Sequence, residues 1–248
     1  MGTDTVGNLG SILGVWAHPD DEAYLSAALM ARAVDDGRDV FCLTATRGAA
    51  GFPDGDERSL EERKALRDRE LRDCLTLLGV TRHRNLGLPD GGCADLPDDE
   101  PVAIVAALIE QLRPDTVLTF GPDGGTGHPD HISACRWATL AFDQVAPKGS
   151  RLLYSTKTRP WAERFMTGVD SSQIMMVEDL EPERVDPETL AVWLTCDDAM
   201  LERKVTALSA QVSQITPMLG MLGVDGFREL VREEFFRDRR PDDPAAPR

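Results

Sequence analysis

Short apolar segments alternate with longer amphipathic segments along the chain. The short segments have the length and continuous hydrophobicity of buried strands, and the longer ones repeat apolar residues at helical spacing. Strands are predicted over residues 11–17, 39–45, 84–88, 116–120, 152–155 and 192–196. Helices are predicted over residues 22–36, 59–78, 101–112, 130–145, 199–214 and 225–236.

The helix predicted over residues 59–78 carries the clearest initiation signal. Ser59 is followed three residues later by Glu62, which is the pattern of a capping box. An apolar stripe that includes Leu71 and Leu78 gives this helix one face to bury. The other faces are strongly charged, so most of its surface is expected to be solvated.

The alternation of strands and helices predicts right-handed βαβ units and therefore an α/β fold. The expected architecture is a Rossmann-like, doubly wound, mainly parallel sheet with helices on both faces. The strand order 3-2-1-4 of such a sheet places the first and fourth strands side by side, here residues 11–17 and 116–120. Ligands bind at the C-terminal strand edge, where the loops that leave these two strands diverge.

The chain is predicted to form a single domain over residues 1–237. Within it, residues 157–190 are rich in Pro, Glu and Asp and lack clear periodicity, which is typical of a surface excursion or a lid. Residues 238–248 are polar and rich in proline, so we expect a mobile tail there.

Composition narrows the classes of function. Of the 248 residues, 42% are hydrophobic, which is enough for a sizeable core. With 27 Lys and Arg against 43 Asp and Glu, the net charge is −16. This balance argues against nucleic acid or an anionic membrane as a partner, because both attract clustered basic side chains. The five cysteines contain no CxxC pair, and we find no signal peptide or membrane span, so we expect a cytoplasmic protein.

The tripeptide His-Pro-Asp occurs twice, and each copy directly follows a predicted strand. The first copy is His18-Pro19-Asp20, continued by Asp21 and Glu22, and the second is His128-Pro129-Asp130, continued by His131. Three of the four histidines of the chain lie in these two segments. Because the preceding strands are expected to be neighbours, the two segments are predicted to face each other across the crevice.

Such a cluster of imidazole and carboxylate groups suits a divalent metal ion. A catalytic zinc site uses three protein ligands and keeps one position open for water. The adjacent residues Asp20 and Asp21 cannot both point the same way on a regular backbone, so one can bind the metal while the other serves as general base. A histidine of the second segment can act as acid or stabilise an oxyanion.

These residues resemble the LmbE-like (PIG-L) family of zinc-dependent N-deacetylases, which includes N-acetylglucosaminyl-phosphatidylinositol and mycothiol-pathway deacetylases. The family segments (P/A)HPDDE and GHPDH correspond here to residues 17–22 and 127–131. Further matches are Arg67 with Glu70 in an R-x-x-E helix, LGLPDG over residues 86–91 and RPDTVLTF over residues 113–120. The resemblance is strong over residues 12 to 140 and weaker beyond.

The resemblance implies a role for nine residues. His18, Asp21 and His131 would bind one zinc ion per chain, although the ligand types also suit other divalent metals. Asp20 would be the general base that activates the zinc-bound water. His128 would stabilise the oxyanion or protonate the leaving amine, with Asp130 orienting it. The implied substrate-binding residues are Arg47, Arg67 and Asp90.

Two positions depart from the family pattern. Gln211 stands where related proteins often have His, and Thr126 stands where some have Tyr. Both positions belong to the substrate side, so they bear on substrate choice. Helix capping by Asp20 or Asp21, and an N-cap role for Asp130, stay open as alternatives to catalysis.

The resulting functional hypothesis is hydrolysis of an N-acyl amide, most simply N-acetyl, on a glucosamine-type sugar conjugate. The small-molecule substrate would be the partner, with no nucleic acid and no membrane insertion, and a homo-oligomer stays open. The alternative is a metal-dependent amidase that acts on a thiol-sugar conjugate or a non-sugar amide. A metal phosphoesterase and a catalytically silent binding protein are further alternatives.

Overall fold

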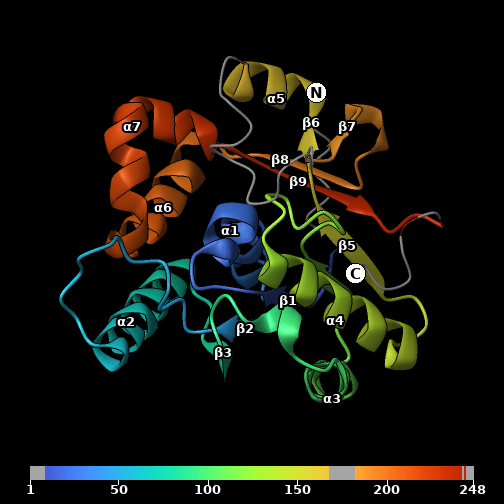
Figure 1. Cartoon of the computed structure of the whole chain (residues 1–248). Helices are drawn as coiled ribbons and strands as arrows, with labels where there is room; N and C mark the ends of the chain where they lie inside the picture. The colour runs from blue at the N-terminus through green and yellow to red at the C-terminus, as the bar shows by residue number, and fades with distance from the viewer. Residues whose placement is uncertain (1–8, 168–181, 242, 244–248) are drawn as a thin grey trace.

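A seven-stranded sheet lies at the centre of the computed structural model, which describes residues 9–167, 182–241 and 243. The strand order is β3-β2-β1-β4-β5-β9-β8 (Figure 1). Its strands are β1 (Ile12–Trp16), β2 (Val40–Thr46), β3 (Arg82–Leu88), β4 (Thr116–Thr119), β5 (Arg151–Ser155), β8 (Val192–Thr195) and β9 (Glu233–Asp238). Two short strands form a separate parallel pair, β6 (Lys157–Thr158) and β7 (Arg184–Val185).

Helices cover both faces of this sheet. They are α1 (Asp21–Asp35), α2 (Leu60–Leu78), α3 (Asp99–Leu112), α4 (Pro129–Val145), α5 (Arg159–Met166), α6 (Asp198–Ser209) and α7 (Val212–Leu230). Helices α1, α2 and α6 pack against one another, whereas α3 and α4 pack together as a separate pair (Figure 1). The predicted doubly wound α/β architecture is confirmed.

The central strands follow directly from their sequence. Every residue of β1 and β4 is buried, as expected for strands covered by helices on both faces. Strand β1 pairs in parallel with β2 on one side and with β4 on the other. The loops that leave β1 and β4 therefore emerge next to each other at one edge of the sheet, as predicted.

The C-terminal part differs from the prediction. The single helix expected over residues 199–214 is two helices, α6 and α7, and the helix expected over residues 225–236 is wrong in its second half. Helix α7 ends at Leu230, and β9 inserts between β5 and β8, antiparallel to both. Four consecutive buried residues fill β9, so pairing within the sheet overrides the helical spacing of its apolar residues.

The segments predicted as a surface excursion and a tail are only partly described. Residues 157–167 and 182–190 form β6, α5 and β7 with short connections, and residues 168–181 lie outside the described residues, so the lid stays a prediction. In the tail, Asp243 accepts hydrogen bonds from the buried guanidinium of Arg237 at 2.7 Å. Residues 242 and 244–248 lie outside the described residues.

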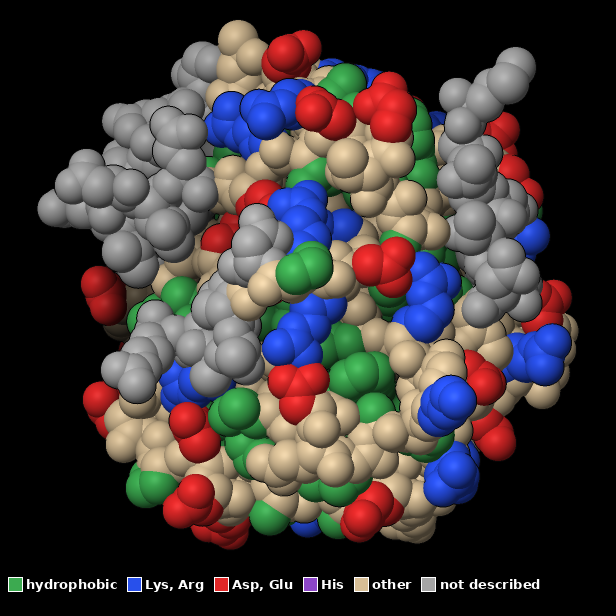
Figure 2. Space-filling model, turned by 90° about the vertical axis from the view of Figure 1, so that its right-hand side faces the viewer, with side chains coloured by type: hydrophobic (Ala, Val, Ile, Leu, Met, Phe, Trp, Pro, Cys, Tyr) green, Lys and Arg blue, Asp and Glu red, His purple; other side chains and the backbone are tan. Residues whose placement is uncertain are grey.

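Charged groups are interspersed on the face shown in Figure 2, where acidic and basic side chains alternate over the surface. Acidic side chains, whose excess gives the chain its net charge of −16, therefore lie among basic side chains on this face. None of the described helices is both long and apolar enough to cross a membrane.

A fully buried ion pair joins the C-terminal segments to the first helix. Lys204 Nζ on α6 lies 2.7 Å from Glu234 Oε1 on β9, and both side chains are 0% exposed. The Glu234 carboxylate also accepts hydrogen bonds from the backbone N–H groups of Ala28 and Leu29 in α1, at 2.8 and 2.9 Å. One carboxylate therefore ties three elements together.

Replacing Lys204 by methionine should lower the free energy of unfolding by about 3–5 kcal/mol, because it leaves the buried Glu234 carboxylate without its counter-charge. Urea denaturation followed by circular dichroism measures this change. The matched control is Arg151→Met, which breaks the exposed pair of Arg151 with Asp238 (3.0 Å) and should cost about 1 kcal/mol or less. Equal losses in the two variants would contradict the structural role of the buried pair.

Candidate metal centre and active site

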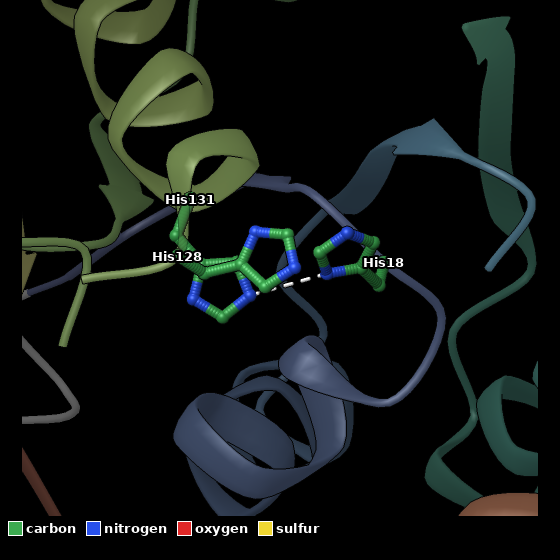
Figure 3. A group of neighbouring side chains, drawn as sticks. All are labelled: His18, His128 and His131. Carbon is green, nitrogen blue, oxygen red and sulfur yellow. Dashed lines mark hydrogen bonds between the residues drawn. The ribbon is translucent and has the colours of Figure 1, made fainter. Parts of the chain in front are cut away.

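Three histidines from two distant segments meet at the sheet edge. His18 follows β1, while His128 and His131 lie at the start of α4, and Figure 3 shows their rings gathered in one place. The ring centroid of His18 lies 4.6 Å from that of His128 and 5.1 Å from that of His131. His18 Nδ1 lies 3.1 Å from His131 Nε2 (Figure 3).

The outer nitrogens of two of these rings are engaged by other groups. His131 Nδ1 lies 2.9 Å from the carbonyl oxygen of Gly124, which only accepts, so this nitrogen carries the proton. His18 Nε2 lies 3.2 Å from both Asp130 and Asp90 and donates to these carboxylates. The remaining nitrogens, His18 Nδ1 and His131 Nε2, thus face each other with their lone pairs, an arrangement that needs a shared proton or a cation.

Asp21 completes a three-cornered site with these two nitrogens. Its Oδ2 lies 3.6 Å from His18 Nδ1, and its Oδ1 lies 3.4 Å from His131 Nε2. Ligand atoms held about 2.0–2.1 Å from a tetrahedral zinc ion are separated by about 3.3 Å, which is close to the 3.1 Å between the two imidazole nitrogens. Asp21 approaches these nitrogens with different oxygens, and its Oδ2 also accepts the backbone N–H of His18 at 2.7 Å. Two imidazoles and one carboxylate are also a donor set that zinc uses in catalytic sites.

The electrostatics of this site favour a positive charge at its centre. Burial acts to lower the pKa of His18, but its hydrogen bonds to Asp130 and Asp90 and the charge of Asp21 outweigh burial and raise the pKa to about 10. Burial and the neighbouring His18 lower the pKa of His131 to about 4, which keeps its imidazole neutral. The described residues therefore surround the position of a cation with negative charge.

Asp20 has an unusual backbone conformation. Its φ angle is 106°, a region that non-glycine residues seldom adopt. Its side chain makes no capping hydrogen bond with α1, so the capping alternative for Asp20 is wrong. Asp20 Oδ2 instead accepts a hydrogen bond from Arg67 Nη2 at 3.3 Å, and its side chain is 19% exposed. Burial raises the pKa of Asp20 to about 6, against the opposing charge of Arg67.

Glu22 stabilises this conformation of Asp20 through its side chain, a role that was not predicted from the sequence. Its Oε2 accepts a hydrogen bond from the backbone N–H of Asp20 at 3.0 Å, and its Oε1 accepts one from Gln211 Nε2 at 2.8 Å. Glu22 is fully buried, and burial raises its pKa to about 8. The position of Glu22 directly after Asp20 and Asp21 could have indicated a role in the site. Its partner Gln211 could not be predicted, because it lies far away in the sequence.

His128 and Asp130 have partners other than those predicted. His128 is the N-cap of α4, and its Nδ1 accepts a hydrogen bond from the backbone N–H of Asp130 at 3.1 Å. The Asp130 carboxylate does not cap the helix: it accepts from the N–H groups of Gly91 and Cys93 and from His18. The expectation that Asp130 orients His128 through its side chain is therefore replaced by a contact with His18, because the carboxylate points into the loop after β3.

The structure brings two of the three predicted substrate-binding residues to this centre. Asp90 contacts His18 and accepts a hydrogen bond from the N–H of Ala50 at 2.6 Å. Arg67 lies beside Asp20, but its guanidinium is only 2% exposed and also donates to the Pro19 carbonyl. Arg47 lies away from the cluster and pairs with Asp68 on α2.

Comparison with known proteins identifies relatives of this chain. The family model for PIG-L, GlcNAc-PI de-N-acetylase, matches residues 13–142. A protein of Rhodococcus opacus (strain B4) named 1D-myo-inositol 2-acetamido-2-deoxy-alpha-D-glucopyranoside deacetylase is 31% identical over 242 residues, which cover 83% of this chain and 82% of that protein.

Two solved structures share the fold. N,N'-diacetylchitobiose deacetylase from Pyrococcus horikoshii has a TM-score of 0.60 at 22% identity, covering 92% of this chain and 83% of that chain. The 4-carboxy-2-hydroxymuconate hydratase GalB has a TM-score of 0.64 at 14% identity, covering 94% and 97%. Since one neighbour is a hydratase, the fold alone does not define the reaction. The family match extends over more than half of the chain and includes both His-Pro-Asp segments, so the chain belongs to the PIG-L family of de-N-acetylases.

Proposed function

We propose that this protein hydrolyses the N-acetyl amide of a glucosamine-type sugar conjugate with the help of one zinc ion. The observation that carries the proposal is the pair of imidazole nitrogens, His18 Nδ1 and His131 Nε2, that face each other at 3.1 Å beside Asp21. These three residues would hold the ion. When bound, it would acidify a water molecule and polarise the amide carbonyl.

Asp20 is the proposed general base. It adjoins the metal ligand Asp21 in sequence, and its strained backbone lets the two carboxylates serve separate functions. Asp20 takes one proton from the attacking water while the oxygen bonds to the carbonyl carbon. It then delivers this proton to the amide nitrogen as the C–N bond breaks, so that the products are acetate and the free amine of the sugar.

His128 is the proposed stabiliser of the charge that develops on the carbonyl oxygen. Because its Nδ1 accepts a hydrogen bond from the N–H of Asp130, the proton of the neutral ring is on Nε2, which can donate. Burial, together with His18 and His131, lowers the pKa of His128 to about 4 and thus favours this neutral form. The geometry therefore supports the oxyanion role over protonation of the amine.

The substrate class follows from the relatives. The Rhodococcus relative is named for a deacetylase of an N-acetylglucosaminide, and this supports a sugar conjugate over a non-sugar amide. Asp90 and Arg67 are proposed to act on the sugar side, Asp90 by contact and Arg67 through Asp20. The five cysteines are free and buried, which supports a reducing compartment such as the cytoplasm.

Replacing Asp20 by asparagine should lower kcat by about 10²–10⁴-fold, because asparagine tolerates the positive φ but cannot accept the proton. Metal content, measured by elemental analysis, should stay at one ion per chain. Asp54→Asn changes an exposed carboxylate and serves as the control with full activity. Activity of Asp20→Asn near that of the wild type would show that another group is the base.

Chelation should abolish amine release, and one equivalent of zinc per chain should restore it, since three side chains here provide ligands for one ion. His131→Ala should reduce the metal bound after dialysis against a fixed free zinc concentration. Two tightly bound ions per chain would contradict the one-metal site and favour a phosphoesterase instead.

A further inference from the structure

A cavity of about 310 Å³ opens directly beside the predicted metal ligands, and Asp21 and His131 form part of its wall. The proposed base Asp20, the proposed oxyanion donor His128 and Asp90 do not line it. The cavity therefore meets the metal centre from a different direction than the groups assigned to proton transfer and to the sugar.

Apolar side chains from several elements form most of the wall. Tyr24 and Leu25 come from α1, and Phe120 follows β4. Trp161 comes from α5, while Met218 and Leu230 come from α7.

Polar side chains also line the wall, among them Thr126, Ser155 and Thr156, and the carboxylates of two others already have partners in the protein. Asp123 accepts hydrogen bonds from the N–H groups of Gly125 and Glu183, and the Glu183 carboxylate accepts one from Arg237. The amine of Lys157 lies 4.6 Å from the ring centroid of Trp161. Among the described residues, the buried atoms Thr156 Oγ1 and Trp161 Nε1 have no hydrogen-bond partner. Such a wall suits an apolar ligand body with one or two polar anchors.

This wall does not match the substituent of the relatives' substrate. The Rhodococcus relative is named for an inositol glycoside, and inositol carries a hydroxyl group on each ring carbon. Placing inositol in this cavity would move those hydroxyls from water to a wall whose surface is mainly apolar, which is unfavourable. An acetyl group is also too small to fill the space, because a cavity of about 150 Å³ already holds benzene.

We propose that the cavity binds an apolar alkyl or aryl aglycone attached to the N-acetylglucosamine unit. The inference rests on the proposed function, since the amide must lie at the metal centre for the aglycone to reach this wall. The N-acetyl group is consumed at the centre, the sugar hydroxyls lie toward Asp90, and the aglycone packs on Trp161 with its linking oxygen near Lys157.

The test is the initial rate of primary-amine release by the zinc-loaded full chain. The substrates are the methyl, inositol, octyl and phenyl glycosides of N-acetylglucosamine, together with methyl N-octanoylglucosaminide as an acyl-side arm. The kcat/KM for the octyl and phenyl glycosides should exceed that for the methyl glycoside by at least about ten-fold. The inositol glycoside should be no better than the methyl glycoside.

Trp161→Ala should reduce the ratio of kcat/KM for octyl over methyl to below about two, because it removes the largest apolar side chain among the lining residues. This ratio does not depend on how much of the variant is folded. Trp193→Ala is the matched control: Trp193 lies on β8, does not line the cavity and should leave the ratio unchanged.

Three results would overturn the inference. Equal kcat/KM across the aglycones, or a preference for inositol, would show that the cavity does not select an apolar aglycone. A preference for the N-octanoyl arm would assign the cavity to the acyl group instead. Absence of amine release from every glycoside, with zinc bound, would refute the proposed function and this inference with it, whereas turnover without preference refutes only the inference.

Discussion

The site depends on holding Asp20 with a positive φ of 106°, because only a break in regular backbone lets two adjacent carboxylates point to different tasks. Such a conformation costs about 1–3 kcal/mol and persists only where the surroundings enforce it. Here Glu22 accepts a hydrogen bond from the backbone N–H of Asp20, and Arg67 donates hydrogen bonds to the Pro19 carbonyl and to the Asp20 carboxylate. A buried acid and a buried base on two helices thus maintain the strained residue.

Residues at the C-terminal helices bind the groups that hold Asp20 in place. Gln211 donates to Glu22, while Ser213 donates to Glu70 on α2, which carries Arg67. Lys204, in turn, neutralises the Glu234 carboxylate that is bound to the middle of α1. Gln211 stands where the resemblance implies histidine, and it provides a donor to Glu22. This departure therefore concerns the support of Asp20, and not the substrate side as the sequence suggested.

The sequence could predict what local patterns and sheet topology determine. The buried strands β1 and β4 and the two His-Pro-Asp segments placed His18, Asp21 and His131 at one edge, and the structure brings them within 3.6 Å of one another. Long-range partners were out of reach. The charged face of α2 gives no sign that Arg67 is buried. The apolar residues of β9 have helical spacing in the sequence, and only pairing with β5 and β8 makes this segment a strand.

The proposed chemistry and the proposed selectivity draw on partly different segments of the chain. The residues proposed to bind metal and transfer protons all lie within residues 13–142, the part that matches the family. The cavity wall combines residues of that part, such as Tyr24 and Phe120, with residues from segments beyond it: Lys157, Trp161, Met218 and Leu230. Because these segments pack on the sheet edge without supplying metal ligands, their side chains can change while the centre stays intact. An apolar wall in this chain is therefore compatible with a relative that acts on a polar glycoside, since the two proteins need share only the centre.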